Sequence, residues 1–137
     1  MQNQYVISTD KSLLNVTAIH DFLSNRSYWA KGRSRATVQT AIDHSLCFGL
    51  YLNGEQLAFT RVVTDCAVFA YLMDVVVFEP YRGQGLGKLL LAEVLAHPQL
   101  QSVNWLLRTL DAQSLYEHFG FKPAPTDMAY MSKAALA

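Results

Sequence analysis

Cysteine is scarce in this chain, and neither sign of charge is in excess. Only Cys47 and Cys66 occur among the 137 residues. Two cysteines without the close spacing of a metal site predict neither a disulfide framework nor a metal centre, so we expect two buried thiols in a reducing compartment. The 11 lysines and arginines equal the 11 aspartates and glutamates in number. Such a chain lacks the basic surface that binds phosphates, and we predict no nucleic-acid partner.

Long apolar runs are also absent. No stretch approaches the roughly 20 residues that a membrane-spanning helix needs. Residues 1–10 are too polar for a signal peptide, so the sequence predicts no membrane partner and a cytoplasmic location. Hydrophobic residues still make up 51% of the chain, which is enough for one core. Without a linker or repeat, this length indicates a single domain over residues 1–137.

Hydrophobic spacing and turn signals predict an α/β chain with an antiparallel front half and a strand–helix–strand–helix back half. The dipeptide Asn53-Gly54 tolerates positive φ at both positions and predicts a hairpin. Helices are expected over residues 13–23, 34–42, 85–96 and 111–118, and strands over 46–52, 56–63, 68–78, 103–107 and 128–132. Helix caps are expected at Asp10 or Ser12, at Ser34 and at Asp111, with Gly120 closing the last helix.

A glycine-rich turn follows the most apolar predicted strand. That strand ends in Val75-Val76-Val77, and the turn Gly83-Gln84-Gly85-Leu86-Gly87 opens an amphipathic pattern. Glycines let the backbone approach a ligand closely, and a helix N-terminus presents N–H groups with partial positive charge. The stretch therefore predicts an anion site for phosphate or pyrophosphate.

Two common phosphate-binding motifs do not match this turn. A P-loop has glycine where Arg82 stands and serine or threonine where Leu89 stands. A dinucleotide fingerprint needs glycine at the position of Lys88. A nucleotide-binding module is therefore a disfavoured alternative.

The turn resembles the R/Q-x-x-G-x-G/A signature of the GNAT family of N-acetyltransferases, with Arg82-Gly83-Gln84-Gly85-Leu86-Gly87 in its place. A second block, residues 111–121, is similar to the "LYEK-GF" ending of that family, and the resemblance covers residues 46–122. It implies an α/β (α+β) fold with a mixed, mostly antiparallel, twisted sheet. Helices would flank this sheet, and it would be splayed at its central strands.

The resemblance also implies an activity. An acetyl group would pass from acetyl-CoA to a primary amine of a small molecule or peptide, by direct attack in a ternary complex and without a metal. A homodimer through edge strands is compatible with the sequence, and a non-catalytic acyl-CoA-binding or regulatory domain is the alternative. By this resemblance the strand would bind the pantetheine arm and the turn the pyrophosphate, through Val75, Val76, Val77, Arg82, Gly83, Gln84, Gly85, Leu86 and Gly87.

Candidate catalytic residues follow from what amine acetylation needs, which is removal of a proton from the amine and protonation of the departing thiolate. Tyr116 occupies the family's tyrosine position and is the candidate acid. Asp74, the lone acid within the apolar strand, is the candidate base, with a structural role as the alternative. Many relatives have glutamate where this chain has Met73. Weaker base candidates are Asp65, His20, His44 and His118.

Before the sheet lies a cluster of aromatic and basic residues. Tyr28, Trp29 and Arg33, with Arg35 nearby, fall in the region that often walls the acceptor site in this family. Aromatic rings and arginines suit an acceptor with apolar and carboxylate groups. A loop packed on the core with solvated arginines is the alternative. Arg61 and Arg108 are expected to form salt bridges.

Overall fold

The computed structural model describes residues 4–136 and divides the chain into two compact units, one up to Leu107 and one from Arg108. Each unit is described by itself, and the single domain predicted over 1–137 stays a prediction. The first unit contains β1 (Val6–Ser8), η1 (Lys11–Leu13), α1 (Val16–Arg26), α2 (Arg35–Asp43), β2 (Leu46–Leu52), β3 (Glu55–Thr64), β4 (Phe69–Val77), η2 (Glu79–Tyr81), α3 (Leu86–Leu95), η3 (Pro98–Leu100) and β5 (Asn104–Leu106). The second contains α4 (Gln113–Glu117).

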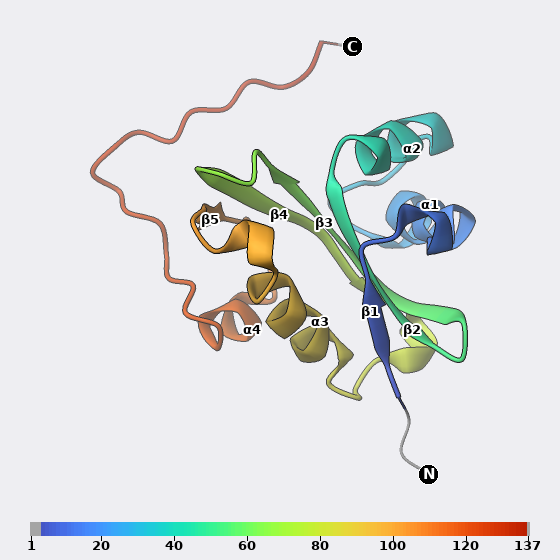
Figure 1. The fold of residues 1–137 in the computed structure, drawn as a ribbon. Helices are drawn as coiled ribbons and strands as arrows, with labels where there is room; N and C mark the ends of the chain where they lie inside the picture. Colours follow the sequence, from blue (N-terminus) through green and yellow to red (C-terminus); the bar gives the residue numbers. More distant parts are fainter. Residues whose placement is uncertain (1–3, 137) are drawn as a thin grey trace. The chain divides into compact units, whose positions relative to one another are not determined.

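The sheet confirms the predicted fold class. Its strand order is β1-β2-β3-β4-β5, and every neighbouring pair is antiparallel except β4 and β5 (Figure 1). The predicted hairpin forms between β2 and β3, with positive φ at Asn53 and Gly54. The parallel strand β5 pairs with β4 only at Phe69–Tyr71, so the remainder of β4 is unpaired on that side. This is the splay expected in the sheet.

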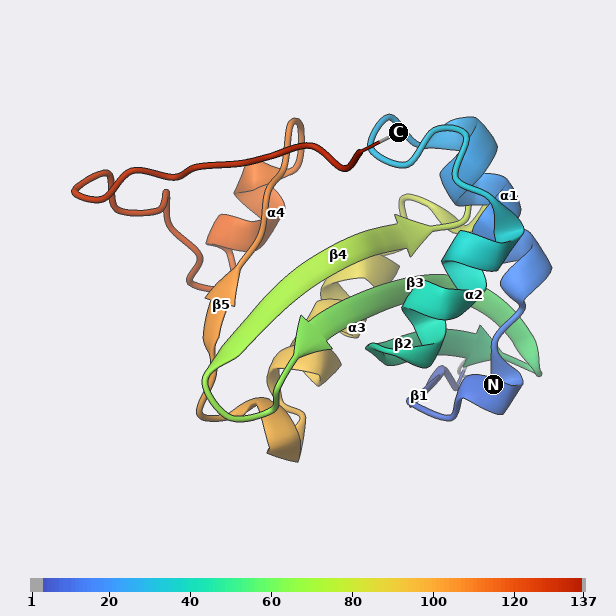
Figure 2. The same ribbon diagram turned by 90° about the horizontal axis from the view of Figure 1, so that it is seen from above.

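Helices cover both faces of this sheet. Figures 1 and 2 show α1 and α2 against one face and α3 against the other. On the α1–α2 side, Phe22 and Leu23 of α1 and Ile42 of α2 pack on Phe59 and Val76 of the sheet. On the other side, α3 buries four apolar side chains: Leu86, Leu90, Leu91 and Val94. Each helix thus buries one apolar face in a core layer, although Leu13 and Leu89, which the periodicity placed on such faces, are exposed.

Several predicted boundaries are wrong. Strand β1 was not expected, and residues 128–132 form no strand. Asp10 caps the separate 3₁₀ turn η1, and α1 begins later in the sequence with Asn15 as its cap. Helix α4 begins after Ala112 without a side-chain cap, so Asp111 is not its cap. Ser34 does cap α2, accepting a hydrogen bond from the Thr37 N–H.

The two thiols differ in environment. Cys47 is buried in β2, and burial raises its pKa to about 11. Cys66 is exposed, in the turn between β3 and β4 and with a φ of 58°, so the expectation of a buried thiol is wrong there. The error arises because apolar neighbours in sequence do not show that a residue lies in a turn.

A bulge interrupts the pairing of β3 with β4. Phe59 pairs with Val76 and Arg61 with Met73, so β4 carries one more residue than β3 over this stretch. Asp74 lies in that stretch with a φ of 54°, a left-handed conformation that aspartate tolerates better than most residues. Between these pairs, the Thr60 hydroxyl donates to the Met73 carbonyl at 3.0 Å. Such a bulge bends the strand and changes the direction in which the nearby side chains and backbone groups point.

Gly49 of β2 is expected to be intolerant of a side chain. A Cβ there would overlap the hydroxyl oxygen of Tyr51 and lie 2.6 Å from its Cζ. Tyr51 is buried, its hydroxyl has no partner among the described residues, and burial raises its pKa to about 12. We expect Gly49→Ala to lower the free energy of unfolding by about 1–3 kcal/mol through overpacking, as measured by urea denaturation.

Tyr51→Phe provides the control for this prediction. It removes the overlapping oxygen and an unsatisfied buried group, so it should be close to neutral alone and should recover part of the loss in Gly49→Ala. Equal stability of Gly49→Ala and the wild type would contradict the packing argument.

Candidate active site

The open side of β4 exposes backbone hydrogen-bonding groups. Phe78 N–H donates to the Leu57 carbonyl of β3 at 3.0 Å. In an antiparallel strand, the backbone N–H and C=O groups of successive residues point to alternate sides. Because Phe78 points toward β3, the backbone groups of Val77 and Val75 point away from it. Val76 pairs with Phe59, and its side chain enters the α1–α2 core. The three valines predicted to bind a ligand thus lie in the part of β4 that does not pair with β5. The backbone groups of Val75 and Val77 point to that open side.

The predicted glycine turn leads from this strand into α3. Gly83 and Gly85 have φ values of 80° and 78°, and Gly85 is the N-cap of the helix. A Cβ added at either position would meet nothing within 4 Å. No side chain caps α3 at Gly85, and the first N–H groups of a helix have no partner inside it. The turn therefore presents unblocked donors at the positive end of the helix dipole.

The side chain of Arg82 folds back onto the protein. Its Nε donates to the Val77 carbonyl at 3.1 Å, and its guanidinium carbon lies 5.6 Å from the centroid of the Phe22 ring. The arginine thereby links the end of β4 to α1. This orientation favours a ligand contact through the backbone of Arg82 instead of its charge.

Two further contacts fix the segment before the glycine turn. Arg26 of α1 pairs with Glu79 at 3.2 Å. The Tyr81 hydroxyl donates to Glu55 of the β2–β3 hairpin, and this hydrogen bond raises the pKa of Tyr81. Helix η2 is thus held on both sides before the chain enters the turn.

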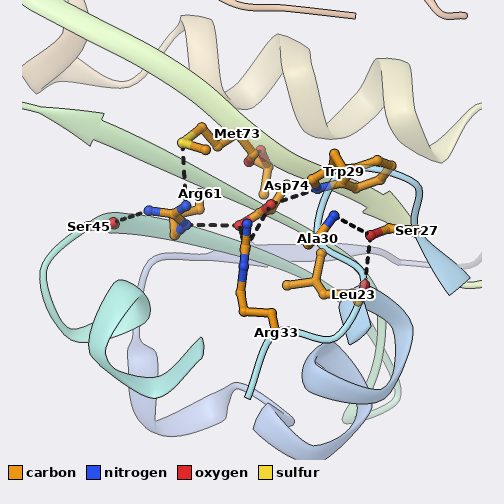
Figure 3. A network of polar contacts seen from close by, with 10 residues as sticks. Leu23, Ser27, Trp29, Ala30, Arg33, Ser45, Arg61, Met73 and Asp74 are labelled. Atoms are coloured by element: carbon orange, nitrogen blue, oxygen red, sulfur yellow. Dashed lines mark hydrogen bonds and ion pairs between the residues drawn. The ribbon is translucent and has the colours of Figure 1, made fainter. Parts of the chain in front are cut away.

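Asp74 lies at the centre of a buried polar network (Figure 3). Its side chain is 1% exposed. One oxygen, Oδ2, accepts hydrogen bonds from Arg33 Nη1 at 3.1 Å and from Arg61 Nε at 3.0 Å. The other, Oδ1, accepts from Trp29 Nε1 at 2.8 Å and makes a longer contact with Arg33 Nη1 at 3.4 Å. Both carboxylate oxygens are therefore saturated by donors.

This saturation bears on the role of Asp74. A carboxylate offers about four lone-pair sites, and four donor contacts occupy them. A general base needs a free lone pair directed at the amine or at a bridging water. The geometry favours the structural alternative, in which Asp74 holds the loop before α2 against the bulge of β4. Its catalytic assignment stays a prediction.

The aromatic and basic loop before α2 does meet the sheet at this point. Trp29 and Arg33 both reach Asp74, and the Tyr28 ring stands edge-on to Trp29 with centroids 5.1 Å apart. Tyr28 and Trp29 are nevertheless 52% and 40% exposed. Arg35 is not part of the network, because its Nη1 donates to Thr17 of α1 at 2.6 Å. The three residues predicted to contact an acceptor thus form one wall beside the bulge.

The sequence did not predict the full membership of this network. Arg61 was expected to form a salt bridge, which is confirmed, but its partner was not foreseen. Its remaining nitrogens contact Ser45 Oγ at 3.1 Å and Met73 Sδ at 3.4 Å. No sequence motif identifies Ser45 as a partner of Arg61. The contact joins the residue before β2 to β3 and exists only in the folded chain.

The other base candidates are engaged in local structure. Asp65 Oδ1 accepts from three backbone N–H groups in the β3–β4 turn, which lowers its pKa. A lowered pKa makes a weaker base. His20 Nε2 lies 3.0 Å from the Arg33 carbonyl oxygen, and His44 Nδ1 lies 3.0 Å from that of Thr40. The His118 ring, in the second unit, lies edge-on to Phe119.

Tyr116 belongs to α4 in the second unit. Its carbonyl accepts from the N–H groups of Phe119 and Phe121, and Gly120 adopts a φ of 90° where the helix closes. The Tyr116 ring packs edge-on against Phe121 with centroids 6.0 Å apart. The predicted block thus folds as a helix closed by glycine, and the catalytic role of Tyr116 stays a prediction.

The matching family model decides the relationship of this chain to known proteins. Residues 43–123, which include β4, the glycine turn and α4, match the model of the acetyltransferase (GNAT) domain. The chain belongs to the GNAT acetyltransferase family. This family membership implies acyl transfer from an acyl-CoA.

Individual relatives agree with that assignment. A presumed acetyltransferase of Gibberella zeae is 33% identical, over 88% of this chain and 81% of its own length. The crystal structure of a presumed GNAT acetyltransferase from Xanthomonas campestris pv. campestris is 46% identical and superposes with a TM-score of 0.92, covering 96% of this chain and 94% of that one. An aminoglycoside N-acetyltransferase, AAC(6')-Iy, solved with CoA, shares the fold at 15% identity and a TM-score of 0.68, with 98% of both chains covered.

The described residues of this GNAT chain contain neither a cluster of metal-ligating side chains nor a helix that could span a membrane. Within residues 4–136, no three histidine, cysteine, aspartate or glutamate side chains lie close enough together to hold a metal ion. No helix in the same part of the chain has the length and hydropathy to cross a membrane.

Proposed function

We propose that this GNAT protein transfers an acetyl group from acetyl-CoA to a primary amine by direct attack in a ternary complex. The observation that carries the proposal is the continuous path from the open edge of β4, at Val75 and Val77, to the glycine turn at α3. Because the Val77 carbonyl already accepts from Arg82 Nε, the strand would offer the Val77 N–H and the backbone groups of Val75 to the amides of the pantetheine arm. The turn supplies N–H groups for the pyrophosphate.

The residues present fit this donor. Gly83 and Gly85 leave open space where a side chain would block a close approach to phosphate. The turn is exposed, whereas Leu86, the first residue of α3, is buried and anchors the helix. The CoA complex of AAC(6')-Iy supports the same choice of donor on the same fold.

The chemistry requires a balanced transfer of one acetyl group. The amine nitrogen forms a bond to the thioester carbonyl carbon, the carbon–sulfur bond breaks, the amine loses a proton and the thiolate gains one. We propose the Val75 N–H, beside the bulge, as the donor to the negative charge that develops on the carbonyl oxygen. Tyr116 is the proposed acid for the thiolate.

Acetyl-CoA is expected to bind in the presence of EDTA, because backbone donors take the place of a metal at the pyrophosphate.

Gly87→Val should weaken the binding of acetyl-CoA at least about 10-fold in calorimetry. A Cβ at Gly87 meets only Val77 Cγ2, at 3.8 Å, so folding should tolerate the change while the new side chain fills space beside β4.

Glu93→Val is the matched control, because it places the same β-branched residue at an exposed position of α3. Binding that requires a divalent ion, or the absence of acetyl-CoA binding by the wild type, would refute the proposed function. Equal affinities of Gly87→Val and Glu93→Val would remove the turn from the donor site.

A further inference from the structure

The network around Asp74 carries an unbalanced positive charge. Arg33 and Arg61 each form an ion pair with Asp74, through the same carboxylate oxygen. Their side chains are only 20% and 10% exposed. Two guanidinium groups therefore share one carboxylate in a mostly buried environment. A second anion bound there would relieve the repulsion between them.

Arg33 is the member of the network with donors to spare. Arg61 uses all three of its nitrogens, on Asp74, Ser45 and Met73. Arg33 uses only Nη1, and its Nε and Nη2 make no hydrogen bond to a described residue. A guanidinium held at one nitrogen by a buried carboxylate is oriented in advance, and its free edge matches a carboxylate geometrically.

The surroundings of Arg33 show which kind of molecule would bring that carboxylate. The exposed rings of Tyr28 and Trp29 lie on the same loop, and Trp29 shares Asp74 with Arg33. Asp74 is adjacent to Val75, the residue proposed to face the thioester carbonyl. An anion on Arg33 would therefore lie close to the reacting centre and next to an aromatic surface.

We infer that the acceptor is an amine that also carries a carboxylate and an aromatic or large apolar group, and that Arg33 binds its carboxylate. This inference rests on the proposed function and names its acceptor class. Arg61, fully engaged, keeps Asp74 in place, while Arg33 makes the contact with the acceptor.

The test compares two product-like compounds that differ only in the carboxylate, N-acetyl-L-phenylalanine and N-acetylphenethylamine. Neither has an ionisable amine, so amine protonation does not enter. Calorimetric titration into the CoA-saturated protein should show at least about 10-fold tighter binding of the carboxylate compound. Arg33→Gln should abolish this preference, and Arg33→Lys should retain part of it through its charge.

Arg35→Gln is the control, since it removes an exposed guanidinium two residues away that donates to Thr17 and is not bonded to Asp74. It should leave the preference unchanged. Circular dichroism of all variants verifies the fold. The inference is overturned if the wild type shows no preference for the carboxylate compound, including no binding of either, or if Arg33→Gln keeps the preference. Failure of acetyl-CoA to bind the wild type, measured in a separate titration, would count against the proposed function instead.

Discussion

Tyr116→Phe is expected to lower kcat at least about 10-fold while the affinity for acetyl-CoA stays that of the wild type. The substitution removes one hydroxyl and keeps the ring that packs against Phe121. If this hydroxyl protonates the departing thiolate, it acts in the transition state, and kcat and kcat/KM fall together. General acid catalysis typically contributes about 10²–10⁴-fold, so a 10-fold loss allows for partial replacement by water.

The measurement is steady-state release of free thiol, with hydrolysis of acetyl-CoA as a surrogate where no acceptor is available. Tyr130→Phe is a matched control, because it removes the hydroxyl of a tyrosine in the same unit that is 66% exposed. Wild-type kcat in Tyr116→Phe across the pH range, with chemistry rate-limiting, would leave the acid unassigned. Binding of acetyl-CoA without turnover by the wild type would favour the non-catalytic alternative.

Asp74→Ala is expected to cost about 3–5 kcal/mol in the free energy of unfolding. Removing one partner of a buried ion pair leaves the other charge uncompensated, and here two arginines lose their counter-ion together. Alanine also tolerates the φ of 54° less well than aspartate does, because its side chain makes no local hydrogen bond. The loss is measured by urea denaturation, with the same m-value (the slope of the unfolding free energy against urea concentration) used for the variant and the wild type.

Asp74→Asn separates charge from backbone conformation. Asparagine accepts a positive φ and can still accept the Trp29 hydrogen bond, so it should lose the ion pairs alone and be about 1 kcal/mol less destabilised than alanine. Adding Arg61→Met to Asp74→Asn should restore part of the stability, because it removes one of the two unpaired charges. A loss below about 1 kcal/mol in Asp74→Ala would contradict the central role of this carboxylate.

Kinetics of Asp74→Asn address the catalytic role that stays a prediction. At a temperature where the variant is folded, loss of a general base would lower kcat by about 10²–10⁴-fold with little change in KM. A positioning role predicts instead a larger change in the acceptor KM, since Trp29 and Arg33 lose their common anchor.

Features that depend on neighbours in sequence were predictable. The glycine turn, the Asn53-Gly54 hairpin and the Ser34 cap each follow from the conformational preference of a few adjacent residues, and all three form. The turn that carries the proposed donor site was therefore predictable before the fold was known. Short or exposed elements were less predictable: β1 forms only because β2 offers a partner, and residues 128–132 form no strand.

The candidate acceptor wall depended on contacts between distant residues. Trp29 and Asp74 are 45 positions apart, and Arg33 and Asp74 are 41 apart. The sequence has an isolated acid in an apolar strand and two arginines in other elements, which left both a catalytic and a structural role open for Asp74. Only the bulge, with its positive φ at Asp74, directed that carboxylate at the loop before α2.

The sequence by itself determined the family, the glycine turn and the core-forming stripes, because local backbone preference and hydrophobic periodicity act over a few residues. Tertiary structure alone decided which charges meet. A register shift of one residue between β3 and β4 brings Asp74 to Arg61, and α1–α2 packing brings Arg33 and Trp29 to the same carboxylate. Burial then makes those contacts strong, because water no longer competes for the donors and the charges interact in a medium of low dielectric constant.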